Sequence, residues 1–78
     1  MEGRTKVILE KVVPEIGPLR YVKKALFLED VVDYEEDSDH NKWTKVFING
    51  EYIFINMSFQ DFDRMYYEEM RNSNLGLL

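Results

Sequence analysis

The densest group of side chains that could do chemistry lies between residues 33 and 40. It holds five carboxylates and the only histidine of the chain: Asp33, Glu35, Glu36, Asp37, Asp39 and His40. Oxygen ligands at alternate positions suggest a calcium loop, but an EF-hand also needs Gly at its sixth position and Glu at its twelfth. Counted from Asp33, those positions hold Ser38 and Thr44. We therefore expect no metal site, and we interpret residues 33–41 as a mobile, solvated acidic loop.

This acidic patch (Asp33, Glu35, Glu36, Asp37 and Asp39) has two interpretations. It can occupy the basic groove of a nucleic-acid-binding partner by charge complementarity, or it can serve solubility alone. Catalysis and a cofactor are not expected. The chain has no Cys, no P-loop and no G-x-G-x-x-G motif, and no Ser has a nucleophile-elbow context. His40 is interpreted as a surface residue.

The second candidate site is a set of aromatic side chains on a predicted hairpin. Asn49–Gly50 separates "WTKVFI" from "EYIFIN", and Asn-Gly favours a two-residue type I′ turn. In the register set by that turn, side chains alternate between two faces. One face is predicted to carry Thr44, Val46, Ile48, Ile53 and Ile55. The other is predicted to carry Trp43, Lys45, Phe47, Tyr52 and Phe54, which we call the aromatic face.

The aromatic face also has more than one interpretation. Trp and Tyr are enriched at the hot spots of protein interfaces, which favours partner binding. The same rings, with Lys45 at a phosphate, could form a stacking platform for single-stranded nucleic acid. Alternatively, the first strand or residues 14–24 cover this face and make it part of the core, since large exposed apolar patches are uncommon on small monomers.

The remaining elements follow from local patterns. Residues 5–13 are rich in β-branched types and predict a strand, followed by a loop marked by Pro14, Gly17 and Pro18. Residues 31–36 are predicted as a strand after a kink at Glu29–Asp30. Residues 19–28 are left open between helix and strand, because periodicity alone does not separate the two for short apolar runs.

A C-terminal amphipathic helix is predicted over about 59–72. Ser58 followed by Asp61 is a capping-box variant, and Met57 and Phe62 occupy the staple positions. An apolar stripe recurs at helical spacing through Phe59, Phe62, Met65, Tyr66 and Met70. Asn and Gly then signal the end of the helix, so we expect the tail 73–78 to fray.

Together these patterns predict one small α+β domain over residues 1–78. We expect a small antiparallel β-meander of three to four strands, with its hairpin at Asn49–Gly50 and the helix packed on one face. The composition is globular, with 45% hydrophobic and 14% aromatic residues. No apolar run is long enough for a membrane span or a signal peptide, so we expect no membrane association and a cytoplasmic location.

Charge is unevenly distributed along the chain, whose formal net charge is −5. Residues 1–24 carry six basic and three acidic groups, whereas residues 25–41 carry seven acidic groups and neither Lys nor Arg. Nucleic-acid binding is therefore disfavoured, because it depends on neutralising phosphates with basic side chains.

These properties are typical of a non-catalytic protein-interaction module, such as an adaptor, inhibitor or regulatory subunit, including those encoded by phages or mobile elements. Its expected partner is another protein, bound through the aromatic face and the acidic loop. The first alternative is a structural component that uses the same face to self-associate. The second alternative is a single-stranded nucleic-acid binder that combines Lys45 with the Arg20, Lys23 and Lys24 group.

Overall fold

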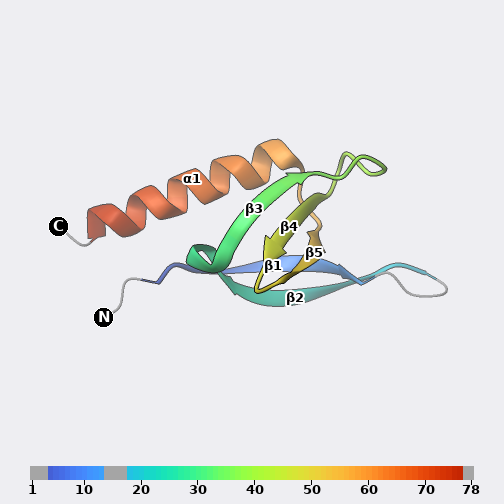
Figure 1. The fold of residues 1–78 in the computed structure, drawn as a ribbon, viewed down its shortest axis with the longest axis horizontal. Coiled ribbons are helices and arrows are strands. Elements are labelled where there is room, and N and C mark those ends of the chain that lie inside the picture. Colours follow the sequence, from blue (N-terminus) through green and yellow to red (C-terminus); the bar gives the residue numbers. More distant parts are fainter. Residues whose placement is uncertain (1–3, 14–17, 77–78) are drawn as a thin grey trace.

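The computed structural model describes residues 4–13 and 18–76, and within them a five-stranded antiparallel sheet and one long helix (Figure 1). The strands are β1 (Lys6–Val13), β2 (Arg20–Phe27), β3 (Val31–Glu36), β4 (Thr44–Ile48) and β5 (Glu51–Ile55). Their order across the sheet is β2-β1-β5-β4-β3. The α+β class with a C-terminal helix is as predicted.

The predicted number of three to four strands is wrong, because residues 20–27 form a full edge strand. β2 pairs with β1 over eight residues, from Lys6 opposite Phe27 to Val13 opposite Arg20. The sheet is also not a simple meander, since β1 lies between β2 and β5 and pairs with β5 at Lys11 and Val12. The periodicity of residues 19–28 is ambiguous between helix and strand. Pairing with β1, which is not a local property of this segment, makes it a strand. Of the predicted loop between β1 and β2, residues 14–17 lie outside the described residues.

One end of β2 and one end of β3 come together at a short 3-10 turn, η1 (Leu28–Asp30). β2 and β3 lie at opposite edges of the sheet, yet only these three residues join them (Figure 1). Leu28 is fully buried at the turn, and its backbone N–H donates to the Thr5 carbonyl at 2.9 Å. The predicted kink at Glu29–Asp30 is this turn.

Glu29 fastens the turn to the start of β1. Its carboxylate accepts hydrogen bonds from the Thr5 backbone N–H and the Thr5 hydroxyl, both at 2.7 Å. Desolvation raises the pKa of Glu29, but these hydrogen bonds outweigh it and hold the pKa below its usual value. Arg4 adds an ion pair with Asp30 and lies over the Phe27 ring, with its guanidinium carbon 4.0 Å from the ring centroid.

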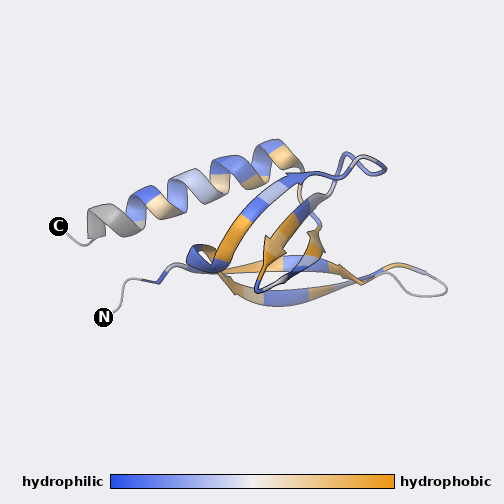
Figure 2. Ribbon diagram, in the orientation of Figure 1, coloured by the Kyte–Doolittle hydropathy of each residue, from blue (hydrophilic) through white to orange (hydrophobic). Residues whose placement is uncertain are grey.

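The β4–β5 hairpin forms as predicted. Asn49 and Gly50 both have positive φ, at 53° and 81°, as a type I′ turn requires. All five predicted cross-strand pairs are present, from Ile48 opposite Glu51 to Thr44 opposite Ile55. The first of the two predicted hairpin faces is buried in full: Thr44, Val46, Ile48, Ile53 and Ile55. Hydrophobic residues gather on the strands, whereas the connection between β3 and β4 is hydrophilic (Figure 2).

The helix α1 (Phe59–Gly76) packs on this buried face through its first half. Ser58 caps it as predicted, since the Asp61 N–H donates to the Ser58 hydroxyl at 3.2 Å. The helix is longer than the predicted 59–72, so residues 73–76 belong to it and not to a frayed tail. Asn and Gly are weak stop signals because each costs only about 1 kcal/mol or less relative to Ala within a helix. Residues 77–78 lie outside the described residues.

The main core cluster of the described residues surrounds Phe62, whose side chain is fully buried. It holds Leu26, Val46, Ile48, Ile53, Ile55 and Phe62, with Met57, Met65 and Tyr66 packed against it. Thr44 is buried beside this cluster, and its hydroxyl donates to the Met57 carbonyl at 2.8 Å.

Tyr34 on β3 ties the edge of the sheet to α1. Its ring centroid lies 4.9 Å from that of Phe62 and 5.4 Å from that of Tyr66. Its hydroxyl donates to the Asp63 carboxylate at 2.6 Å. Burial, together with the hydrogen bond to Asp63, raises the pKa of Tyr34 to about 12. Tyr34 is therefore a structural residue that anchors the helix.

The acidic segment is more ordered than the predicted loop over 33–41. β3 continues through Glu36, so only residues 37–43 connect it to β4. Pairing with β4 holds these acidic residues extended, since Glu35 lies opposite Lys45 and Glu36 opposite Thr44. In the part of the chain that the structure describes, no helix is long and apolar enough to cross a membrane.

Candidate interaction surface

The aromatic face lies on the side of the β4–β5 hairpin that points away from α1. The inward side chains of the hairpin pack with Phe62, so the alternating set points to the opposite side. This placement is the one that the Asn-Gly turn predicts. It puts Trp43, Lys45, Phe47, Tyr52 and Phe54 together on one surface.

The rings of this face form a continuous chain of contacts. Phe47 meets Tyr52 with ring centroids 6.1 Å apart, and Tyr52 meets Phe54 at 5.5 Å, both edge to face. Phe54 then meets Trp43 at 6.1 Å. Edge-to-face and tilted contacts at these distances are the favoured arrangements of aromatic pairs. The face is therefore a pre-ordered surface, held by a rigid hairpin.

Lys45 lies among the rings and makes cation–π contacts with two of them. Its ammonium nitrogen is 4.2 Å from the centroid of the Tyr52 ring and 5.4 Å from that of Phe47. Both distances are within the range of cation–π attraction. On this face the electron-rich sides of the aromatic rings are thus able to receive a positive charge.

The aromatic face is partly open to solvent. Tyr52 is 50% exposed, and Trp43, Phe47 and Phe54 are half-buried. The expectation that the first strand or residues 14–24 cover the face is not met by the described residues. β1 and β2 instead extend the sheet beside β5. Residues 14–17 of that segment lie outside the described residues.

Two residues that sequence reasoning missed extend the face across the sheet. Val12 on β1 lies opposite Phe54 on one side and opposite Tyr21 of β2 on the other. Residues that face each other across antiparallel strands point to the same side of the sheet. Val12 is only 1% exposed, whereas Tyr21 is 47% exposed at the outer strand. The aromatic surface thus continues from the hairpin to Tyr21.

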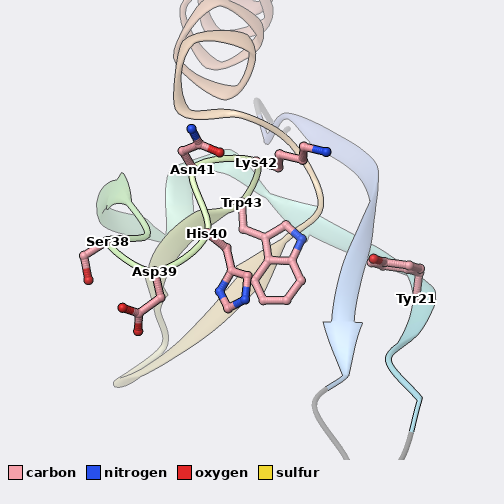
Figure 3. Close-up of a pocket in the computed structure, with 7 residues that line it drawn as sticks. All are labelled: Tyr21, Ser38, Asp39, His40, Asn41, Lys42 and Trp43. Atoms are coloured by element: carbon pink, nitrogen blue, oxygen red, sulfur yellow. The ribbon is translucent and has the colours of Figure 1, made fainter.

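A hollow opens beside Trp43, between β2 and the loop of residues 37–43. It has a volume of about 540 Å³ and is lined by Tyr21, Ser38, Asp39, His40, Asn41, Lys42 and Trp43. Figure 3 shows Trp43 and His40 on one side of the hollow and Tyr21 on the other. Its walls therefore combine aromatic rings with hydroxyl, amide and carboxylate groups.

His40 holds the loop in shape at the edge of the hollow. Its ring stacks on the Trp43 indole, with centroids 4.2 Å apart and an interplanar angle of 22°. Its Nδ1 pairs with the Asp37 carboxylate at 3.0 Å. The backbone N–H of Trp43 also donates to the His40 carbonyl at 2.9 Å, and the backbone N–H of Asp37 donates to the Trp43 carbonyl at 3.3 Å. His40 is exposed as predicted, but it also supports Trp43.

The structure divides the predicted acidic patch. Asp33 lies opposite Phe47 and Glu35 opposite Lys45, so both belong to the side of the sheet that carries the aromatic face. Glu36 lies opposite Thr44 and belongs to the other side. Asp37 and Asp39 lie in the loop, where Asp39 lines the hollow. The carboxylates thus border the aromatic rings at β3 and at the loop.

The alternation of the acidic residues works against a metal site. In an extended strand, successive side chains point to opposite faces of the sheet, which separates neighbouring carboxylates. Within residues 4–13 and 18–76, no three His, Asp or Glu side chains are grouped so that they could hold a metal ion.

Comparison of the chain with protein-family models, with curated proteins and with solved structures found no match in any of the three. What the chain binds must therefore be inferred from the geometry and the charge of its own residues.

Proposed function

We propose that this chain is a non-catalytic protein-interaction module, such as an adaptor, inhibitor or regulatory subunit. It binds a protein partner through the aromatic face, and the neighbouring acidic residues favour a partner with a basic surface. The observation that supports this best is the contact chain Phe47–Tyr52–Phe54–Trp43, which is partly exposed on the side of the sheet away from the helix.

The energetics of interfaces favour this role. A few buried aromatic residues supply most of the binding free energy at a typical interface, and Trp and Tyr are prominent among them. Here the rings are already ordered by their mutual contacts and by the hairpin, so little conformational entropy is lost on binding. Aromatic residues on a rigid sheet are a suitable anchor for a partner.

The shifted titratable groups support a structural rather than a catalytic role. Glu29 has a lowered pKa and Tyr34 a raised one. Their hydrogen-bond partners are Thr5 and Asp63, and neither Glu29 nor Tyr34 lines the hollow beside Trp43. Each shift follows from a bond that fastens one element of the fold to another.

Self-association is the second candidate, and the distribution of charge across the sheet favours it. Arg20, Lys23 and Lys24 lie on edge strand β2, whereas Asp33, Glu35 and Glu36 lie on the opposite edge strand β3. Opposite charges on opposite edges would suit head-to-tail contact between copies. The net charge of −5 opposes such contact, since every copy carries it. Sedimentation at micromolar concentration distinguishes the candidates, because a strict monomer excludes this one.

Alanine substitutions on the two faces of the same strand test the proposal. Tyr52→Ala removes an exposed ring and is expected to change the free energy of unfolding by less than about 1 kcal/mol, while abolishing retention of the partner by the immobilised chain. Ile53→Ala is the matched control for the buried face. It removes a core side chain and is expected to cost about 2–5 kcal/mol.

Urea unfolding measures the free energy of unfolding, and recovery of proteins from lysate by the immobilised chain measures retention of the partner. If Tyr52→Ala and Trp43→Ala both retain the same set of proteins as the unsubstituted chain, the aromatic face is not the binding surface. If no specific protein is retained by the unsubstituted chain, the proposed function is wrong.

A further inference from the structure

We infer that the partner docks an extended basic segment on this surface, with an arginine side chain in the hollow between Tyr21 and Trp43. This inference rests on the proposed function and identifies the chemistry of the partner. It depends on three properties of the hollow and its surroundings: its size, its walls and its charge.

The hollow is large enough for a long side chain. Small-ligand sites typically have volumes of about 300–1,000 Å³, and this one has about 540 Å³. Tyr21 at its edge is exposed, so an extended segment has access to the hollow and one of its side chains can enter. The surface continues from there over Phe54 and Tyr52, which gives neighbouring residues of the segment an apolar contact.

The walls of the hollow suit a guanidinium group. This group is planar and weakly hydrated, stacks on aromatic rings and presents five N–H donors. Trp43, His40 and Tyr21 supply the rings, and Asp39 supplies a carboxylate acceptor (Figure 3). The same surface already holds one cation over a ring, since the Lys45 ammonium lies 4.2 Å from the Tyr52 centroid.

The carboxylates of β3 and of the loop of residues 37–43 favour a basic segment on their side of the hollow. Residues 33–45 carry five carboxylates and two lysines, a net charge of −3; of these, Glu36 points to the other side of the sheet, and Lys23 on β2 shares the side of Tyr21. Asp33 and Glu35 share the side of the sheet with the rings. Lys42 is the one cation in the lining, and in Figure 3 its amine points away from the Asp39 carboxylate. These carboxylates would repel a nucleic acid and attract a basic segment, and the net charge of −5 opposes the approach of a second copy.

Fluorescence anisotropy with labelled peptides tests this inference on the full chain. The probes are hexa-arginine, hexa-lysine and hexa-glutamate, each carrying the same dye. We expect hexa-arginine to bind at least five-fold more tightly than hexa-lysine, and hexa-glutamate not to bind. Equal affinity for the two basic peptides would mean that charge alone acts, and would overturn the assignment of an arginine site. Binding of labelled oligothymidine in place of hexa-arginine would also overturn it.

Four variants locate the binding site. Tyr21→Ala and Asp39→Asn are expected to weaken hexa-arginine binding at least five-fold, and Asp39→Asn does so without removing any packed side chain. Tyr67→Ala and Glu69→Gln are the matched controls, because they remove an exposed ring and an exposed carboxylate from α1, outside the hollow. Affinity unchanged in the first pair, or lowered equally in both pairs, would overturn the inference.

The inference and the proposed function can fail separately. If hexa-arginine does not bind, while Tyr52→Ala still loses a partner that the unsubstituted chain retains, the inference is wrong and the proposed function stands. If the aromatic substitutions affect neither the peptide nor the partner, both are wrong. Quenching or enhancement of Trp43 fluorescence by unlabelled hexa-arginine supports the site directly, since Trp43 is the only tryptophan of the chain.

Discussion

Tyr34 shows how one residue couples the chemistry of a side chain to the stability of the fold. It belongs to edge strand β3, and its hydroxyl donates to Asp63 on α1. Its neighbour Asp33 was predicted as part of a mobile acidic loop, and the Asp33 carboxylate instead accepts the Tyr34 backbone N–H at 2.8 Å. The sequence offers no signal for the contact between Tyr34 and Asp63, because the two residues lie 29 positions apart.

Alkaline pH is expected to destabilise the protein through Tyr34. Burial and the hydrogen bond to Asp63 raise the folded-state pKa to about 12, above the value of about 10 in an unfolded chain. The folded state therefore retains the proton more strongly. The contribution to stability is complete below about pH 10 and is lost as the pH rises to about 12. Urea unfolding midpoints at pH 8 and pH 11.5 measure this loss.

Tyr34→Phe is the control that separates this effect from the titration of other groups. At pH 8 the variant is expected to lose about 1 kcal/mol with the hydrogen bond, less than is usual for a charged acceptor because Asp63 is exposed. Between pH 8 and pH 11.5 its midpoint should fall less than that of the unsubstituted chain. Equal falls in the two proteins would show that Tyr34 does not carry the alkaline loss.

At the scale of elements, prediction succeeded where the signal is local. The hairpin follows from two turn residues, and with it the register of five residue pairs and the separation of the aromatic face from the core. The helix start follows from Ser58 and Asp61 for the same reason. β2 and its Tyr21 were not predicted as strand and surface, because their placement depends on pairing with β1 across a connection that does not fix the register.

The Asn-Gly turn provides a direct test of this local control. Gly50 has a φ of 81°, and a Cβ added there would meet no heavy atom within 4 Å. Gly50→Ala therefore introduces conformational strain without a clash, and is expected to cost about 1–2 kcal/mol. Asn49→Gly is the control, since Gly adopts the φ of 53° freely and the change should be within about 1 kcal/mol. Urea unfolding measures both, and an equal cost at the two positions would contradict the turn assignment.

At the scale of the whole molecule, the two sides of the sheet differ in the surfaces they present, and its two edges differ in charge. One side packs with α1 and forms the core, and the other presents rings bordered by Asp33 and Glu35. Basic residues gather on β2, at the far edge from the acidic strand β3. The uneven charge is visible in the sequence, but its placement on opposite edges is a result of the strand order.

Substitutions of two adjacent acidic residues on β3 distinguish long-range attraction of a basic partner from direct contact with it. Glu35 lies on the side with the aromatic rings, and its exposed neighbour Glu36 lies on the other side. At 0.1 M salt the Debye length is about 10 Å, so both charges attract an approaching hexa-arginine peptide. Glu35→Gln and Glu36→Gln are therefore expected to slow association similarly, by about two-fold, and this difference should vanish at high salt. Only Glu35→Gln should also speed dissociation, because only Glu35 borders the bound segment.

Stopped-flow fluorescence of Trp43 measures both rates. Faster dissociation from the Glu36→Gln variant would place the peptide on the side of the sheet opposite to the aromatic face, and would contradict the proposed surface.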